Sequence, residues 1–174
     1  RIVESMGFEV VYLTGLGVSA SFLGLPDLGL LSFSELYTVA KNVNRATSLP
    51  VIADGETGFG NALNVMRMVR ELEEIGIAGV HIEDQIWPKR SRIGELLPVS
   101  EHTDKIRAAI AGRSDKKFII IARTDALTKY GVKETIQRSN MYLSAGADMV
   151  FPHGIDSLED LRFIAKNVGG PLLI

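Results

Sequence analysis

Short runs of apolar, mostly β-branched residues alternate along the chain with longer stretches in which apolar residues recur every three or four positions. The short runs predict strands, and their nearly continuous hydrophobicity is typical of strands buried on both faces of a parallel sheet. We expect strands over residues 10–14, 51–54, 79–84, 118–124, 149–152 and 171–174.

The stretches between these runs predict amphipathic helices. Ser32 and Glu35 have the spacing of a capping box, and we expect the helix that follows to reach about Thr47. Leu63, Met66, Val69, Leu72 and Ile75 recur at helical spacing and predict a helix over residues 62–75, ending at Gly76. Further helices are expected over residues 1–6, 101–111, 133–145 and 157–167, the last capped by Asp156.

The strand starts repeat about every 32 residues. Eight such units would need about 250 residues, the usual size of a (β/α)8 barrel. The 174 residues hold five units and a sixth strand. We therefore predict an α/β chain that forms part of one TIM-type (β/α)8 barrel domain over residues 1–174, incomplete here and containing about strands 2 to 7. An open doubly wound sheet is the structural alternative.

Composition and charge argue against several classes of function. The chain is 46% hydrophobic and 23% charged, with 19 basic and 21 acidic residues and a net charge of −2. These totals give no support to a nucleic-acid or membrane surface, and no apolar run reaches the length of about 18 residues that spans a bilayer. We expect a soluble, cytoplasmic protein. The absence of cysteine excludes thiolate metal sites and cysteine nucleophiles.

Polar residues gather where the predicted strands end. Asp54, Glu56, Glu83 and Asp84 follow or close two of these strands, and barrel strands converge at that end on one mouth. Any single acidic residue there could simply cap the next helix. Taken together, the four predict a cluster of carboxylates that holds a hard cation, Mg²⁺ or Mn²⁺.

The three histidines are scattered along the chain, which argues against zinc. His81 alternates with Glu83, so both can face the barrel interior, and we expect His81 to form hydrogen bonds rather than bind a metal. His102 lies at an exposed-looking helix start and is expected to face solvent. His153 follows the fifth strand.

Two other segments have a bearing on function. Gly15-Leu-Gly17 mimics a dinucleotide-binding turn, but Gly24 and Pro26 follow too soon for a helix of useful length, so we exclude nucleotide binding. Residues 86–99 form a long connection that is basic and lies beside the acidic mouth. Such connections are often lids, with a solvated loop as the alternative.

Five motifs resemble, in order and spacing, those of the isocitrate lyase and phosphoenolpyruvate mutase superfamily. They are Leu25-Pro-Asp-Leu-Gly29, Asp54-Gly-Glu-Thr-Gly-Phe-Gly-Asn61, His81-Ile-Glu-Asp-Gln85, Pro88-Lys-Arg90 and Ala122-Arg-Thr-Asp-Ala126. The resemblance implies a (β/α)8 barrel, a homotetramer that exchanges its eighth helix, and a Mg²⁺-held small oxoacid or phosphonate whose enolate the metal stabilises.

The same resemblance assigns expected roles to individual residues. Asp54 and Glu83 match metal ligands, and Glu56 falls where the family usually has Asp. Asp27 matches an acidic residue near the reacting group, and Lys89 the lysine of the gating loop. The remaining matches concern substrate: Arg123 matches the carboxylate-binding arginine, and Tyr12, Thr14, Gly15 and Leu16 match the strand end that holds the substrate, with His81 beside it.

One departure is informative. The related lyases carry a catalytic cysteine in the gating loop, and Ser91 stands in its place here, followed by Arg92 and Ile93. An alcohol without an adjacent base is a poorer acid or base than a tuned thiol. We therefore predict a lyase for a small 2-oxo- or 2-hydroxy-dicarboxylate, either oxaloacetate decarboxylase-like, as Asn61-Ala-Leu-Asn-Val-Met-Arg67 suggests, or a C–C lyase. The alternatives are a phosphonomutase- or phosphonopyruvate hydrolase-like enzyme and a catalytically weak oxoacid-binding relative.

Overall fold

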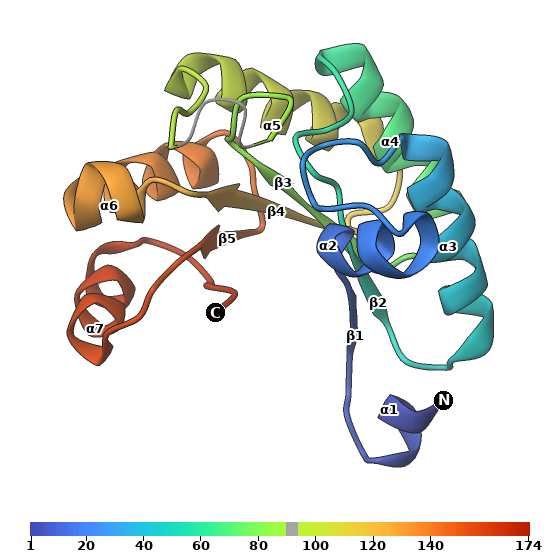
Figure 1. The fold of residues 1–174 in the computed structure, drawn as a ribbon. Helices are drawn as coiled ribbons and strands as arrows, with labels where there is room; N and C mark the ends of the chain where they lie inside the picture. The colour runs from blue at the N-terminus through green and yellow to red at the C-terminus, as the bar shows by residue number, and fades with distance from the viewer. Residues whose placement is uncertain (90–93) are drawn as a thin grey trace.

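The computed structural model describes residues 1–89 and 94–174. Its five strands form one parallel sheet in the order β1-β2-β3-β4-β5, and helices cover the outer side of the sheet (Figure 1). In chain order the elements are α1 (Ile2–Ser5), β1 (Val11–Leu13), α2 (Gly15–Val18), the π-helix η1 (Ser19–Leu23), α3 (Phe33–Ala46), β2 (Val51–Asp54), α4 (Ala62–Glu74), β3 (Gly79–Glu83), α5 (Val99–Gly112), β4 (Ile119–Thr124), α6 (Leu127–Ser144), β5 (Met149–Pro152) and α7 (Leu158–Asn167).

Each sequential strand pairs with the next, as the alternation of strands and helices predicts for a barrel wall. An open doubly wound sheet would instead reverse its strand order at a switch point. The predicted α/β fold with parallel strands is confirmed. None of the helices in the described ranges is long and apolar enough to cross a membrane.

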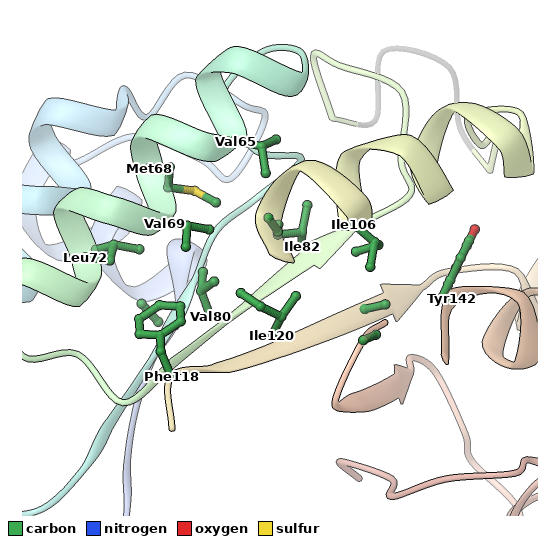
Figure 2. Close-up of a cluster of buried hydrophobic side chains, with 14 of the residues drawn as sticks. Val65, Met68, Val69, Leu72, Val80, Ile82, Ile106, Phe118, Ile120 and Tyr142 are labelled. Atoms are coloured by element: carbon green, nitrogen blue, oxygen red, sulfur yellow. The ribbon is translucent and has the colours of Figure 1, made fainter. Parts of the chain in front are cut away.

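The main core lies between the sheet and helices α4, α5 and α6 (Figure 2). From α4, Val65, Met68, Val69 and Leu72 are fully buried. They pack in one cluster with Val80 and Ile82 of β3, Ile106 of α5, Ile120 of β4 and Tyr142 of α6. This packing fixes the outer faces of β3 and β4, whose ends carry the candidate site.

Local signals set several helix ends as expected. Ser32 Oγ accepts a hydrogen bond from the Glu35 backbone N–H, and the Glu35 carboxylate accepts one from the Ser32 N–H, which completes the predicted capping box. At the last helix the cap is Ser157 rather than Asp156, because the Ser157 hydroxyl accepts from the Asp160 N–H.

Short helical turns begin directly after β1 at Gly15 and end at Gly24 in a left-handed conformation, in agreement with the expectation that no long helix follows. Two other local expectations were wrong. Residues 171–174 form no strand, and Leu172 makes only an isolated bridge to Val150. Leu63 is 81% exposed, because the buried face of α4 is centred on Val65 and Met68 instead.

Candidate active site

The register of the sheet brings the polar strand ends together. Asp54 of β2 pairs with His81 of β3, and Glu83 of β3 pairs with Arg123 of β4. These four residues come from three strands that are separate in sequence and adjacent in space. The carboxyl ends of parallel strands therefore form one polar site, as they do in barrels of this type.

Asp54 organises the turn that follows β2. Its Oδ1 accepts a hydrogen bond from the Glu56 N–H at 2.9 Å, and its Oδ2 accepts one from the Gly15 N–H at 2.9 Å. Glu56 has a φ of 52°, a left-handed conformation that is uncommon outside glycine. The Asp54 carboxylate thus compensates the strained turn and aims the Glu56 side chain into the site.

Lys89 lies at the centre of the acidic residues. Its Nζ is 2.5 Å from Glu56 Oε2, 2.7 Å from Asp27 Oδ1 and 3.9 Å from Glu83 Oε1, and only 4% of its side chain is exposed. The carboxylates raise the pKa of Lys89, although burial alone would lower it. The ammonium group is therefore charged at neutral pH and neutralises part of the cluster.

Arg123 is held in place by its neighbours. Its Nε and NH2 groups donate to the two Asp125 carboxylate oxygens at 2.9 and 2.8 Å, a bidentate pair. Glu83 Oε2 lies 3.5 Å from the Arg123 Nε, and His153 Nδ1 lies 2.9 Å from Asp125 Oδ1. Burial would raise the pKa of Asp125, but hydrogen bonds from His153 and Arg123 lower it strongly, so the carboxylate stays ionised.

Tyr12 and His81 form the β1 side of the site. The Tyr12 hydroxyl and His81 Nε2 are 2.5 Å apart in a hydrogen bond, and the two rings stack with an interplanar angle of 4°. Burial lowers the pKa of His81 to about 4, against the attraction of Asp54. His81 is therefore neutral at pH 7 and acts as a hydrogen-bonding group, which agrees with the expectation for it.

Two carboxyl groups of the site have strongly raised pKa values. Burial and the repulsion of Asp54 raise the pKa of Glu56 to about 7, although Lys89 opposes the shift. Burial raises the pKa of Glu83 to about 8, even with Arg123 and Lys89 nearby. Displaced carboxyl pKa values in one polar site are typical of catalytic or cation-binding centres.

The donor chemistry fits a hard divalent cation. Both Glu83 carboxylate oxygens are buried and accept no hydrogen bond from any described residue. With Asp54 and Glu56 they form a set of oxygen donors of the kind that Mg²⁺ and Mn²⁺ prefer. As the side chains lie, no group of three His, Asp or Glu residues in the described ranges could hold a metal ion.

Most of the predicted site residues lie together here. Asp27, Glu56, Glu83, Lys89 and Arg123 are joined by the ion pairs above, and Asp54 joins them through the hydrogen bond from the Glu56 N–H. Tyr12, Gly15 and His81 lie on the β1 side. Thr14 and Leu16 flank Gly15 at the start of α2, where Leu16 is 55% exposed. Ser91, Arg92 and Ile93 lie outside the described residues.

Two residues lie elsewhere than expected. Asp84 does not join the acidic mouth, because its carboxylate points outward to Arg138 and Tyr142 of α6. His102 is not solvent-facing: it is fully buried, with its ring 4.6 Å from that of Tyr142. Helix α5 begins earlier than predicted, at Val99, so His102 falls on its inner face.

Sequence reasoning assigned no role to Asp125 or Lys105. Asp125 holds Arg123, and Lys105 Nζ donates to the Thr57 carbonyl at 2.9 Å beneath the Glu56 turn. The position of Asp125 at a strand end was a usable signal. Lys105 gave none, because a lysine within a helix usually faces solvent.

The fold and the polar strand ends together define part of a TIM-type α/β barrel. The family model described as phosphoenolpyruvate phosphomutase matches residues 1–174, and the chain belongs to this family, within the isocitrate lyase and phosphoenolpyruvate mutase superfamily.

Several relatives are similar over nearly the whole chain. A 2,3-dimethylmalate lyase of Eubacterium barkeri is 43% identical over 98% of this chain and 60% of its own length. A 2-methylisocitrate lyase of Aeropyrum pernix is 43% identical over 99% of this chain and 56% of its own. A solved structure of phosphonopyruvate hydrolase with oxalate and Mg²⁺ has a TM-score of 0.90 at 35% identity, covering 98% of this chain and 61% of that one. The chain thus spans about 60% of the length of these relatives.

Proposed function

We propose that the protein is a Mg²⁺-dependent lyase that cleaves a carbon–carbon bond in a small 2-oxo- or 2-hydroxy-dicarboxylate. The observation that carries this proposal is the placement of Arg123 next to the acidic cluster of Asp27, Glu56 and Glu83, in which both glutamates are fully buried. A guanidinium beside a cation-binding carboxylate set suits a substrate with one carboxylate on the arginine and an oxo group on a metal. The names of the lyase relatives support the same class.

The chemistry of each side chain suggests which residues would bind the metal ion and which would bind the substrate. Asp54, Glu83 and Glu56 would hold the divalent ion, which when bound polarises the substrate oxo or hydroxyl oxygen. Arg123 would bind a substrate carboxylate, and its pairing with Asp125 fixes the direction in which the guanidinium points. The backbone at Thr14, Gly15 and Leu16, with Tyr12 and His81, would line the carboxylate and oxo side of the substrate.

Lys89 and Asp27 would handle the proton at the reacting carbon. The Lys89 ammonium is 2.7 Å from Asp27 Oδ1, within direct proton-transfer distance. The 174 residues contain no cysteine, so among them a group other than a thiol would protonate the carbanion formed when the bond breaks. A buried ammonium can supply that proton, and the neutral amine left behind would then take up a proton from water, with the Asp27 carboxylate favouring the charged form again.

A second candidate function is the cleavage or formation of a phosphorus–carbon bond. The likeness to phosphonopyruvate hydrolase favours it, because that protein is similar over 98% of this chain. Its substrate would place a phosphonate where the first candidate places the distal carboxylate. A weak oxoacid-binding relative is the third possibility.

Assays of the full-length protein separate these functions. With Mg²⁺, release of CO₂ or of a C–C cleavage product from oxaloacetate or a dimethylmalate supports the first candidate, and phosphate release from phosphonopyruvate supports the second. EDTA should abolish either activity. Failure of oxalate plus Mg²⁺ to raise the thermal midpoint would contradict both, whereas stabilisation by oxalate without turnover of either substrate would favour the third.

Asp54→Asn tests the site within the same experiment. Loss of one anionic donor should abolish metal-dependent activity and the stabilisation by oxalate with Mg²⁺. Asp104→Asn is a matched control, since Asp104 is an exposed carboxylate on α5 that pairs only with Arg107 among the described contacts. Unchanged activity in Asp54→Asn would remove Asp54 from the site.

We also propose that residues 1–174 form part of a single barrel domain in a cytoplasmic homotetramer. Light scattering of the full-length protein measures the subunit number, and a monomeric mass would contradict the tetramer.

A further inference from the structure

We propose that Asp84 is a positioning residue that holds Arg123 and the C-terminal end of the long connection, at Leu97, in their working positions. The proposal rests on the proposed function, because it assumes that Arg123 binds substrate. It differs from the expectation drawn from the sequence, in which Asp84 was one more negative charge at the mouth.

The Asp84 carboxylate is fully buried and bound on all sides. Oδ2 accepts hydrogen bonds from Thr124 Oγ1 at 2.8 Å, from the Tyr142 hydroxyl at 2.8 Å and from Arg138 NH1 at 3.2 Å, and Oδ1 accepts one from the Asp125 N–H at 3.0 Å. A carboxylate with four donors at fixed positions ties the end of β3 to the end of β4 and to α6.

The contact from Asp84 that leads most directly to the Arg123 side chain passes through Asp125. The Asp125 N–H is anchored on Asp84, and the Asp125 carboxylate accepts both hydrogen bonds from Arg123. A shift of the Asp125 backbone would therefore turn the guanidinium away from Glu83 and from any bound carboxylate. Displacements of about 1 Å in a binding group cost large factors in affinity and rate.

The same residue also anchors the chain that returns from the long connection. The Leu97 N–H donates to the Asp84 carbonyl at 2.8 Å, and Arg138 NH1 donates to the Leu97 carbonyl at 3.1 Å. Lys89 lies near the N-terminal end of the same connection, with its ammonium group in the site. Asp84 and Arg138 thus fix one end of the segment whose other end carries the central ammonium group.

The first test needs no ligand. Arg123 and Arg113 are matched reporters: each pairs with an aspartate, and their side chains are 13% and 12% exposed. Asp148 accepts from Arg113 and from the Ile120 N–H at the opposite end of β4, so Asp148→Asn removes a comparable anchor away from the site. The rate of phenylglyoxal modification of each arginine, located by mass spectrometry, reports how firmly it is held.

Asp84→Asn should speed modification of Arg123 severalfold and leave Arg113 unchanged, whereas Asp148→Asn should do the reverse. An unchanged Arg123 rate in a folded Asp84→Asn protein overturns the proposal, whether or not the protein binds oxalate. If Asp84→Asn fails to fold, Tyr142→Phe removes one donor to the same oxygen and should give a smaller increase at Arg123 alone.

The second test connects Asp84 to binding. Asp84→Asn should weaken Mg²⁺-dependent oxalate binding about tenfold, equivalent to about 1.4 kcal/mol, while Asp148→Asn leaves it unchanged. If Asp84 acts through Arg123, the Asp84→Asn/Arg123→Lys protein should bind no more weakly than Arg123→Lys alone. Fully additive losses contradict the proposal. Absence of oxalate binding in the unaltered protein contradicts the proposed function instead, and the arginine modification rates then decide the role of Asp84.

Discussion

Gly15 lacks a side chain at a position where the site leaves no room for one. A Cβ built there would lie 1.8 Å from Glu56 Oε1 and 3.1 Å from Asp54 Oδ2. The Gly15 N–H also donates to Asp54, so the backbone must approach the acidic cluster closely. Glu56, which is longer than the Asp usual in related proteins, therefore has room in the site only because residue 15 is glycine.

Gly15→Ala should push the Glu56 carboxylate out of place and lower Mg²⁺-dependent oxalate affinity at least tenfold, a steric displacement of the kind that is costly in packed sites. Titration calorimetry measures it. The Gly15→Ala/Glu56→Asp protein should recover part of the loss, because the shorter acid withdraws from the new methyl group. Gly169→Ala is the control, since its nearest neighbour would be an ordinary contact at 3.6 Å. Equal affinities in all the variants would show that Glu56 does not face the site.

Glu83 gives the metal-free protein a specific pH dependence. Its folded pKa of about 8 lies above the unfolded value of 4.5, so the folded state binds more protons between these values and stability falls as pH rises. Glu56, with a pKa of about 7, acts in the same direction. His81, whose pKa is lowered to about 4, acts oppositely, but only below its ordinary value of 6.5.

Between pH 6.5 and 8.5, Glu83 and Glu56 therefore determine more of the pH dependence of folding stability than His81 does. The thermal midpoint of the EDTA-treated protein should fall with rising pH across that window, and Glu83→Gln, which cannot ionise, should flatten the decline. Scanning calorimetry at several pH values checks the slope. Identical slopes in the two proteins would mean that Glu83 is ionised in the folded state throughout.

The residue types of the site were predictable because their chemistry depends on the ends of strands, which the sequence marks clearly. The direction of the Asp84 side chain was not predicted correctly. Glu83 and Asp84 are adjacent, and adjacent strand residues point to opposite faces of a sheet. His81 and Glu83 follow that alternation into the site. Asp84 follows it outward to Arg138, a partner 54 residues away that no local pattern could identify.

At the scale of elements, the turn between β2 and α4 is the most demanding part of the site. Glu56 and Phe59 both have positive φ values, and the turn places Glu56 against Lys89. Beneath it, Lys105 of α5 is buried and donates to the Thr57 carbonyl at 2.9 Å. The buried ammonium therefore supports the turn from the helix side.

Lys105→Met keeps much of the side-chain volume but leaves the Thr57 carbonyl without this donor. We expect the free energy of unfolding to fall by about 1–3 kcal/mol, the cost of an unsatisfied buried polar group. Urea denaturation measures it, with Lys116→Met, at an exposed lysine, as the control. A loss no larger than that of the control would show that the turn holds its conformation without Lys105.

The positions of helices and strands along the chain were predicted more reliably than which of their side chains are buried. Strands β2 and β5 have the predicted bounds, α3 begins after its predicted capping residue Ser32, and α4 begins at Ala62 as predicted. In α4, however, the apolar spacing included Leu63, which is exposed, and omitted Met68, which is buried. The direction of the core depends on β3 and α5, which pack on α4 from distant parts of the chain.

At the scale of the whole molecule, the parallel sheet followed from continuous apolar runs, while the last predicted strand did not form. Residues 171–174 have the composition of a strand, yet only Leu172 pairs with β5. A strand needs a neighbour along its length, and composition alone does not supply one. Ser91, which stands where the related lyases carry a cysteine, lies outside the described residues, so what it implies for the function rests on the sequence alone.

That substitution sets the last prediction, which concerns substrate range. The relatives include 2-methylisocitrate lyases, yet these 174 residues contain no cysteine, and the Lys89–Asp27 pair is one proton donor that the described site offers. We expect turnover of isocitrate and 2-methylisocitrate by the full-length protein to fall well below the order of 10 per second of ordinary enzymes. Steady-state assays with Mg²⁺ measure it, and Lys89→Met should abolish whatever lyase activity a preferred substrate shows. Turnover of 2-methylisocitrate at ordinary enzymatic rates would show that Lys89, or another group, fully replaces the thiol.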